Sequence, residues 1–294
     1  MNTSTDLQCQ AILKGLLELE AVLGKPIANE ALDLAENANA MRQKDMLGRL
    51  RRSLVQYLER SGSLIYVALI GHFSSGKSST INSLLNLWDS REERASALNP
   101  TDKNITLITH AKNANSLLGV VSYGAVPIRL QTIENKMLAE IVLADTPGTG
   151  DPHLLEEMAR DFLPICDLVL FFFPAASPLD STDIPLLTEL TRRLPFIPLK
   201  FIVTRADELR RDATKPLTPD NFDSGRAMIF IAEIMSRITL LLQNSKYSQN
   251  DVLLIDNKAQ FNIDELRMTS LQVQIHQTLR VESQCIATKL DISK

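Results

Sequence analysis

Residues 64–85 read LIYVALIGHFSSGKSSTINSLL, and this stretch decides the fold. The continuous apolar run Leu64–Ile70 is typical of a strand buried on both faces of a sheet. It leads into Gly71-His-Phe-Ser-Ser-Gly-Lys-Ser78, which fits the pattern G-x-x-x-x-G-K-[ST]. The spacing of apolar residues that follows predicts a helix over Ser78–Leu87. A strand, a glycine-rich turn and a helix in this order are the setting that a phosphate-binding loop requires.

The residue types of this loop explain how it would hold phosphate. Its glycines let successive backbone N–H groups point inward, and the start of the following helix adds positive potential. We expect Lys77 to reach the β- and γ-phosphates of a nucleotide and the Ser78 hydroxyl to bind Mg²⁺. The other loop residues expected to contact nucleotide include Gly71, Ser75, Gly76 and Ser79. A chance match in a glycine turn is the alternative, and the strand–loop–helix setting argues against it.

From residue 64 to about residue 257, short apolar runs alternate with helical patterns. The predicted strands are Leu64–Ile70, Ile105–Thr109, Val126–Gln131, Leu138–Ala144, Leu168–Phe173, Leu199–Val203 and Val252–Ile255. The predicted helices among them are Ser78–Leu87, Leu154–Phe162, Asp183–Arg193 and Asp223–Leu242. This alternation predicts an α/β fold of the P-loop type, with a mostly parallel central sheet covered on both faces.

A second motif, Asp145-Thr-Pro-Gly148, follows the predicted strand Leu138–Ala144. An acidic residue at the tip of an inner strand is where a phosphate-loop NTPase holds Mg²⁺, so we expect Asp145 to bind the ion through water. We expect the backbone N–H of Gly148 to face the γ-phosphate. A plain turn is the alternative, because Asp, Pro and Gly all favour turns.

A third motif, Thr204-Arg205-Ala-Asp207, follows Leu199–Val203 and resembles the guanine-reading pattern [NT]-K-x-D. The Asp207 carboxylate can accept from both N1–H and the exocyclic amine of guanine, whereas adenine offers no matching pair of donors. Arg205 stands where Lys is usual, and its planar guanidinium can still stack on a base. An exposed Asp in a charged loop is the alternative. All three motifs follow the carboxyl ends of predicted parallel strands, where open sheets bind ligands. Together they therefore predict one guanine-nucleotide site.

Family resemblance adds to these motifs. Gly71–Leu85 resembles the phosphate loop and following helix of the dynamin superfamily. Asn86-Leu-Trp-Asp89 and Asn104-Ile-Thr106 are similar to mitofusins and bacterial dynamin-like proteins. The long segment between the phosphate loop and the Asp-x-x-Gly motif is also similar to dynamins, and Ras-like GTPases match less well. The resemblance covers residues 64 to about 257 and implies a GTPase (G) domain that hydrolyses GTP to GDP and phosphate.

The resemblance also implies roles for single residues. Thr106 would be the switch threonine that closes on Mg²⁺ and the attacking water, a role for which Thr101 and Thr109 compete. Ser74 would contact phosphate or a monovalent cation, K⁺ or Na⁺. Asn257 would close over the base, where a plain turn is the alternative. The implied catalytic residues are Lys77, Thr106, Ser74 and Gly148, and the implied metal-binding residues are Ser78, Thr106 and, through water, Asp145.

Two positions depart from the patterns of related GTPases. The residue after Asp-x-x-Gly, a Gln in Ras-like enzymes, is Thr149, and the third loop position, a Gln in dynamin, is Phe73. Because Phe73 cannot hydrogen-bond, we expect slow hydrolysis by the isolated chain and faster hydrolysis once dimerisation orders the switches. We do not expect His72 to act as a general base, since the middle positions of such loops mostly contribute backbone groups.

Helical patterns flank the core in the sequence. Apolar residues at three- and four-residue spacing predict helices over Asp6–Leu23 and Ala31–Leu58, and a similar stripe predicts one over Asp264–Leu290. We therefore predict three parts: an N-terminal helical segment (1–62), a G domain (63–258) and a C-terminal helix (259–294). We expect the C-terminal helix to pack with the N-terminal helices as a small bundle, which the resemblance implies is a moving neck.

Composition narrows the function classes. The chain has 294 residues, with 31 Lys and Arg against 35 Asp and Glu, and this acidic balance gives no electrostatic footprint for nucleic acid. The three cysteines form no Cys-x-x-Cys pair, so neither a disulfide framework nor a zinc site is suggested. The sequence shows no signal-peptide pattern and no apolar run of the length that a spanning helix needs. We expect a cytoplasmic protein that can also act at the periphery of a membrane.

The sequence therefore predicts a dynamin-like GTPase that remodels membranes. Its expected cofactor is Mg²⁺, and its expected partners are GTP or GDP, a second copy bound through the G domain, and membrane lipid or a second dynamin-like subunit. One alternative is a regulatory switch that controls a protein partner. Another, which the acidic balance disfavours, is a GTPase that acts on ribosomes or RNA.

Overall fold

The computed structural model describes residues 64–94, 104–117, 127–148, 157–159, 162–194, 197–243 and 247–271, together with Lys14. Apart from Lys14, the predicted helices over 6–58 lie outside the described residues, as does the part of Asp264–Leu290 beyond residue 271. All described residues except Lys14 belong to one compact unit, Ser63–Val273. The division of the chain into three parts stays a prediction.

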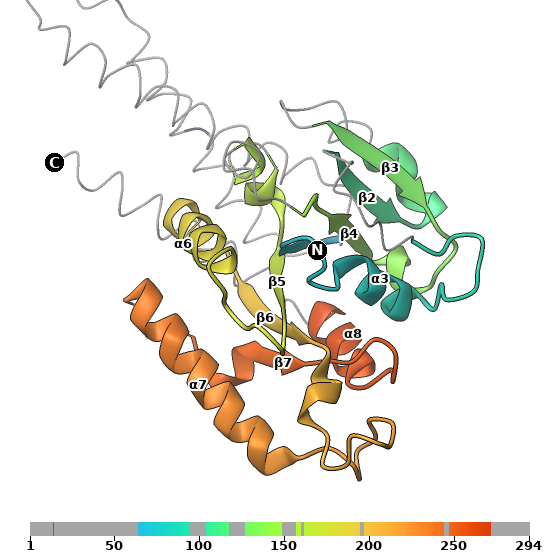
Figure 1. Cartoon of the computed structure of the whole chain (residues 1–294). Helices are drawn as coiled ribbons and strands as arrows, with labels where there is room; N and C mark the ends of the chain where they lie inside the picture. The colour runs from blue at the N-terminus through green and yellow to red at the C-terminus, as the bar shows by residue number, and fades with distance from the viewer. Residues whose placement is uncertain are drawn as a thin grey trace, which may run out of the picture. The chain divides into compact units, whose positions relative to one another are not determined.

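One seven-stranded sheet forms the centre of the described unit (Figure 1). Its strands are β1 (Ile65–Gly71), β2 (Ile105–Thr109), β3 (Ile128–Thr132), β4 (Ile141–Asp145), β5 (Leu168–Pro174), β6 (Leu199–Thr204) and β7 (Val252–Leu254). Their order across the sheet is β3-β2-β4-β1-β5-β6-β7. The five strands from β4 to β7 in this order run parallel to their neighbours. Only the contact between β2 and β4 is antiparallel, so the predicted mostly parallel sheet is confirmed.

Helices cover both faces of this sheet. The α-helices are α3 (Lys77–Leu85), α6 (Asp183–Arg193), α7 (Ser224–Leu242) and α8 (Ile263–Leu271). The 3-10 helices are η1 (Ala111–Leu117), η2 (Met137–Ala139), η3 (Leu163–Ile165), η4 (Ala206–Leu209) and η5 (Gln249–Asp251). In Figure 1, α6 and α7 lie on one side of the sheet, and α3 and α8 lie on the other. Within the described ranges, no helix combines the length and the hydrophobicity that crossing a bilayer requires.

The central strands are the most deeply buried part of the unit. All seven residues of β1 are buried, and so are the six residues of β5 from Leu168 to Phe173. The rings of Phe171 and Phe201 meet edge to face across β5 and β6, with centroids 6.4 Å apart. Burying one such side chain stabilises the fold by about 2 kcal/mol. The carboxyl ends of these strands are therefore held rigidly by the core, and the loops that follow them begin at fixed positions.

Most predicted elements have the expected bounds, and the largest difference lies before β4. The predicted strand Leu138–Ala144 begins later, at Ile141, because residues Met137–Ala139 form η2. Asn135 Oδ1 accepts a hydrogen bond of 2.9 Å from the Met137 backbone N–H, which turns the chain before the strand. Of the predicted helix Leu154–Phe162, residues 157–159 are described and helical.

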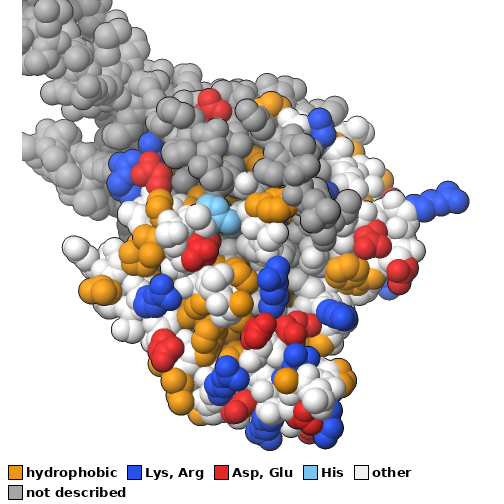
Figure 2. All heavy atoms as spheres, in the orientation of Figure 1, with side chains coloured by type: hydrophobic (Ala, Val, Ile, Leu, Met, Phe, Trp, Pro, Cys, Tyr) orange, Lys and Arg blue, Asp and Glu red, His pale blue; other side chains and the backbone are white. Residues whose placement is uncertain are grey.

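Acidic and basic side chains are interspersed over the described part of the face in Figure 2. Close ion pairs among the described residues include Lys200 with Asp251 at 2.6 Å. A surface on which both signs of charge are mixed favours solubility and creates no large field of a single sign.

Candidate functional site: a nucleotide cavity

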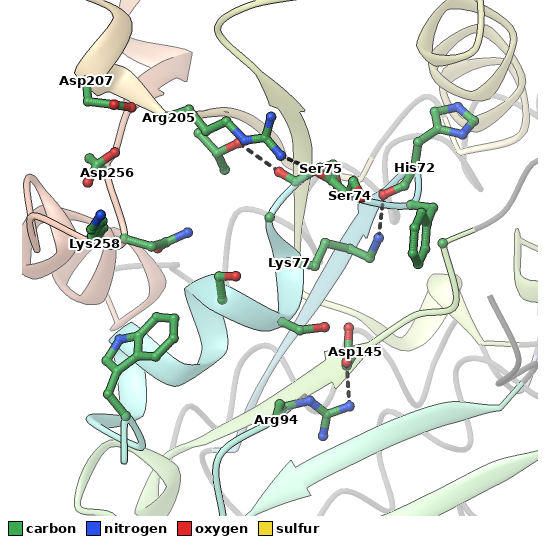
Figure 3. A pocket seen from close by; sticks show the side chains of 18 of the residues that line it. His72, Ser74, Ser75, Lys77, Arg94, Asp145, Arg205, Asp207, Asp256 and Lys258 are labelled. Atoms are coloured by element: carbon green, nitrogen blue, oxygen red, sulfur yellow. Dashed lines mark hydrogen bonds and ion pairs between the residues drawn. The ribbon is translucent and has the colours of Figure 1, made fainter. Parts of the chain in front are cut away.

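The loops that follow β1, β4, β6 and β7 meet around one cavity of about 960 Å³ (Figure 3). These four strands are parallel, so their carboxyl ends lie at one edge of the sheet, where open α/β sheets bind ligands. Every residue predicted to bind nucleotide or metal lines the cavity except Gly71, which shapes the loop beneath it. Contact of these residues with a nucleotide stays a prediction.

Two glycines shape the phosphate loop. A Cβ on Gly71 would lie 2.5 Å from the Phe172 carbonyl oxygen and 2.7 Å from Ser75 Oγ. Gly76 has a φ of +97° just before α3, in the left-handed region that side chains rarely adopt. Ser74 is also left-handed, with a φ of 62°. This turn aims the first turn of α3 at the cavity, where N–H groups without helical partners can bind phosphate.

Lys77 is held inside the loop by backbone carbonyls. Its Nζ donates hydrogen bonds to the carbonyl oxygens of Gly71 at 2.6 Å and His72 at 3.0 Å. Burial lowers the pKa of Lys77 to about 8, while the nearby carboxyls of Asp145 and Asp183 oppose the shift. A buried ammonium is suited to bind an anion such as phosphate.

The end of β6 is tied to the phosphate loop by two side chains. The Thr204 hydroxyl, which is buried, donates to the Ser75 carbonyl oxygen at 2.8 Å. Arg205 has a left-handed backbone, with a φ of 60°, and its Nη2 donates to the Ser74 carbonyl oxygen at 3.3 Å. Thr204 therefore fixes the backbone of the phosphate loop at Ser75. The expected stacking of Arg205 on a base stays a prediction.

Two carboxyls stand together on the side of the cavity away from Asp145 (Figure 3). Asp207 is partly exposed, and Arg210 Nη2 lies 3.5 Å from its Oδ2. Asp256 is buried, and its Oδ1 accepts from the Ala259 backbone N–H at 2.6 Å. Burial, together with a side-chain hydrogen bond to Asp207, raises the pKa of Asp256. Sequence reasoning missed Asp256, because Asp-Asn-Lys after a strand also fits an ordinary turn.

Trp88 and Asn257 line the same cavity beside α3. The Trp88 indole N–H donates to Ser83 Oγ at 3.0 Å, which fixes the ring next to the helix. Asn257 Nδ2 donates to Thr80 Oγ1 at 3.0 Å, and its carbonyl oxygen accepts from Ser83 Oγ at 3.1 Å. The loop after β7 is thus fastened to the helix that begins at the phosphate loop. Trp88 is a further residue that the motifs did not single out.

The three residues predicted to bind Mg²⁺ converge on this cavity. Thr106 lies opposite Asp145 in the antiparallel register of β2 and β4, and Ser78 is in the first turn of α3. Thr109 is fully buried and accepts from Asn113 Nδ2, so the geometry favours Thr106, while Thr101 lies outside the described residues. Two hydroxyls and one carboxylate are hard oxygen donors that suit Mg²⁺. Within the described ranges no three His, Cys, Asp or Glu side chains group as metal ligands.

The Asp145–Gly148 turn packs directly on the phosphate loop. A Cβ on Gly148 would lie 2.9 Å from the Phe73 backbone nitrogen and 3.3 Å from the His72 carbonyl carbon. Glycine at this position therefore permits the close approach that its expected γ-phosphate contact requires. Phe73 is 40% exposed and lines the cavity, and Thr149 lies outside the described residues.

His72 faces α6 rather than the phosphate side of the cavity (Figure 3). Its Nε2 hydrogen-bonds the Thr182 carbonyl oxygen and lies 3.9 Å from Asp183 Oδ1. Burial, with the neighbouring Asp180 carboxylate, raises the pKa of Asp183 to about 7. Because Nε2 is bonded to a carbonyl, it must carry a proton and cannot accept one there. The expectation that His72 is not a general base stays a prediction.

Comparison with known proteins bears on the same part of the chain. Residues 66–203, from β1 to β6, match the sequence profile of a family described as 50S ribosome-binding GTPase. The chain carries a P-loop GTPase domain. The phosphate loop, the Asp145–Gly148 turn and most of the sheet of this G domain lie inside the matched range. No protein with a curated description matches the chain.

Several solved structures are similar to this chain at low sequence identity. A structure described as an oligomerised bacterial dynamin pair is 15% identical, with a TM-score of 0.49 over 100% of this chain and 57% of its own. The chain thus spans little more than half the length of that relative. Toc33 from Arabidopsis thaliana is 15% identical, with a TM-score of 0.43 over 81% of this chain and 91% of its own. Elongation factor SelB from Methanococcus maripaludis is 16% identical, with a TM-score of 0.39 over 74% and 33%.

Proposed function

We propose that the chain is a dynamin-like GTPase of the cytoplasm and the membrane periphery. It binds GTP with Mg²⁺, pairs through its G domain, and uses hydrolysis to move the flanking helices at a membrane. The observation that carries nucleotide binding is one cavity of about 960 Å³, which has Lys77 at one side and the Asp207 carboxylate at the other. This volume suits a small-molecule site.

Guanine is the base that this cavity suits. Asp207 is partly exposed and its carboxylate can accept two parallel hydrogen bonds. The base edge that matches this carboxylate carries two donors side by side. Guanine presents N1–H and an exocyclic amine at that edge, and adenine has no such pair.

Hydrolysis would depend on charge and positioning. Lys77 and the Gly148 N–H would bind the oxygens of the transferred phosphoryl group, and Mg²⁺, when bound, would neutralise charge on them. Thr106 would hold the attacking water, and Ser74 would contact phosphate or a K⁺ or Na⁺ ion. The Phe73 side chain lines the cavity but offers no hydrogen bond to water. The isolated chain is therefore slow, and a partner that fixes the switch segments accelerates it.

Pairing through the nucleotide face rests on the dynamin resemblance of the phosphate loop and on Phe73. This ring is 40% exposed at the cavity, and exposed aromatic residues are enriched where proteins associate. Work on a membrane rests on the resemblance alone.

The nucleotide preference is tested with Asp207→Asn. Xanthine carries a carbonyl where guanine has its exocyclic amine, and an Asn amide can donate to that carbonyl. We expect GDP affinity to fall by about 10²-fold and xanthosine diphosphate affinity to rise, because a site built for one hydrogen-bond pattern rejects another strongly. Glu208→Gln, at the exposed neighbour, is the matched control. Equal GDP affinity in both variants contradicts the assignment of Asp207.

Pairing and membrane action are tested separately. Mass measurements in solution should show a dimer with GDP plus aluminium fluoride and a monomer with GDP. Sedimentation with anionic liposomes should depend on a non-hydrolysable GTP analogue.

A GTPase of the ribosome is a second candidate, because the matched family is described as ribosome-binding. The interspersed charges in Figure 2 give it no support on that face, since RNA binding favours a basic area. Nucleotide-dependent sedimentation with ribosomes, and none with lipid, would decide for this candidate. Capture of a protein partner without lipid or ribosomes would decide for a regulatory switch.

A further inference from the structure

Arg94 is fixed to the helix that follows the phosphate loop. Asn82 of α3 is fully buried, and its side-chain amide hydrogen-bonds both the N–H and the carbonyl group of Arg94. Asn82 Oδ1 accepts from the Arg94 N–H at 2.8 Å, and Asn82 Nδ2 donates to the Arg94 carbonyl oxygen at 2.9 Å. The position of the Arg94 backbone is therefore set by α3, and its side chain extends into the cavity lining.

The Arg94 guanidinium binds the carboxylate that is expected to hold Mg²⁺. Its Nη2 lies 2.5 Å from Asp145 Oδ2 (Figure 3), and Nη1 donates to Gln131 Oε1 at 2.8 Å. The side chains are 19% and 10% exposed, so water screens the pair weakly. Arg94 Nε is buried and has no hydrogen-bond partner among the described residues. Nη2 thus binds one carboxylate, Nη1 binds one amide, and the third nitrogen of the guanidinium is buried.

A water molecule bound to Mg²⁺ and the Arg94 guanidinium would compete for the Asp145 carboxylate, because Nη2 already donates to its Oδ2 in a partly buried pair. Lys77 also faces Asp145, so two protein cations already act on this carboxylate. Adding a divalent ion beside both would be opposed by like-charge repulsion in a partly buried site.

We propose that Arg94 is the internal counter-ion of Asp145, and that Mg²⁺ with nucleotide must displace it. This inference rests on the proposed function. Arg94 compensates the charge of the buried Asp145 carboxylate when the ion is not bound. It also lowers the affinity for Mg²⁺ by the energy of the broken pair.

The test uses Arg94→Met, which removes the charge and keeps much of the length. GDP binding is followed through Trp88, the single tryptophan of the chain, over a series of free Mg²⁺ concentrations. We expect the Mg²⁺ midpoint to fall about tenfold or more, since a hydrogen bond to a charged group is worth at least 1.4 kcal/mol, or tenfold. Arg192→Met, which removes an exposed guanidinium paired with Glu189, should leave the midpoint unchanged. A midpoint that stays equal or rises in R94M overturns the proposal.

A second measurement needs no nucleotide and therefore separates this inference from the proposed function. Melting temperatures are compared for R94M, D145N and the double variant. Breaking the pair in R94M leaves a buried carboxylate, so we expect its melting temperature to fall by about 4 °C or more. Adding D145N should restore much of that loss, because the negative charge that Arg94 compensates is then absent as well. Additive effects of the two changes overturn the counter-ion role. A wild-type chain that binds no guanine nucleotide, yet shows this coupling, refutes the proposed function and leaves the Arg94–Asp145 pair established.

Discussion

The Thr204 hydroxyl donates a hydrogen bond of 2.8 Å to the carbonyl oxygen of Ser75. The same side chain also contacts the next residue of the phosphate loop, because a Cβ on Gly76 would lie 2.9 Å from Thr204 Cγ2. One buried threonine at the end of β6 thus supports the loop between β1 and α3 and begins the loop that carries Asp207. The two halves of the nucleotide cavity are joined at this residue.

Replacing Thr204 by Val should weaken both stability and nucleotide binding. Val keeps the shape but cannot donate, so the Ser75 carbonyl loses its partner. We expect the free energy of unfolding in urea to fall by about 1–2 kcal/mol and GDP affinity to fall severalfold. Thr188→Val is the control, since the Thr188 hydroxyl donates only to a carbonyl of its own helix and is exposed. GDP affinity equal to wild type in T204V would show that the bond does not shape the loop.

Replacing Gly148 by Ala should act on hydrolysis more than on GDP binding. The added Cβ would lie 2.9 Å from the Phe73 nitrogen, so the Asp145–Gly148 turn would have to move away from the phosphate loop. We expect the GTPase rate to fall roughly tenfold or more, as when one transition-state donor is removed. GDP has no γ-phosphate, so its affinity should change little. Gly225→Ala in α7 is the control, because its Cβ meets only an ordinary contact at 3.5 Å. A GTPase rate in G148A equal to that of G225A would exclude the expected γ-phosphate role.

The parts of the fold that sequence could predict are those with a strong local signal. The apolar run of β1, the glycines of the phosphate loop and the start of α3 specify one another over a few residues. The strands that follow are buried on both faces, and this makes their apolar runs conspicuous. Because parallel strands end at one edge, the meeting of the Asp145 and Asp207 loops with the phosphate loop followed from topology alone.

Other parts of the site depend on contacts between distant residues, which carry no local pattern. Asn82 looks like any polar helix residue, yet its buried amide fixes Arg94 beside Asp145. Asp256 shares a hydrogen bond with Asp207 only because β6 and β7 are neighbours. The antiparallel direction of β2 was also unpredictable, since an apolar run has the same composition in either direction.

Asp183 should make stability depend on pH. The residue is only 2% exposed, and burial, with the nearby Asp180, raises its pKa to about 7 from 3.8. Between these values the folded state holds a proton that the unfolded state has lost. The stabilisation from this carboxyl is therefore complete below about pH 4 and is lost as pH rises through 7, by about 1 kcal/mol per pH unit.

Asp183→Asn removes this dependence, because the amide does not titrate. Urea unfolding at pH 5 and pH 7.5 should show that D183N gains stability relative to wild type at the higher pH. Asp220→Asn, at an exposed turn, should follow the wild-type profile. Parallel profiles for D183N and wild type would mean that Asp183 is ionised in the folded state at pH 5.

Arg267 should be the main link between α8 and the helix of the phosphate loop. Its Nε donates to the Leu84 carbonyl oxygen at 2.9 Å, and its Nη2 donates to the Ser83 carbonyl oxygen at 2.6 Å and to Asn86 Oδ1 at 2.9 Å. The last carbonyls of a helix have no partner within it, and a cation there also complements the helix dipole. Arg267→Met removes the donor to the Leu84 carbonyl and one of two donors to the Ser83 carbonyl, which also accepts from the Asn86 N–H at 3.4 Å, so we expect a loss of about 2 kcal/mol in urea unfolding.

The planar arrangement of the guanidinium donors, rather than the positive charge, should account for most of this stabilisation. Arg267→Lys keeps the charge but cannot donate to three oxygens in a fixed plane, so it should recover only part of the loss. Arg192→Met is the control, because Arg192 is 62% exposed and its pair with Glu189 is worth at most about 1 kcal/mol. The Ser83 carbonyl that Arg267 holds belongs to the residue that also binds Trp88 and Asn257, so R267M should speed GDP release as well. If R267M and R192M lose equal stability and release GDP at equal rates, α8 is not coupled to the nucleotide cavity through Arg267.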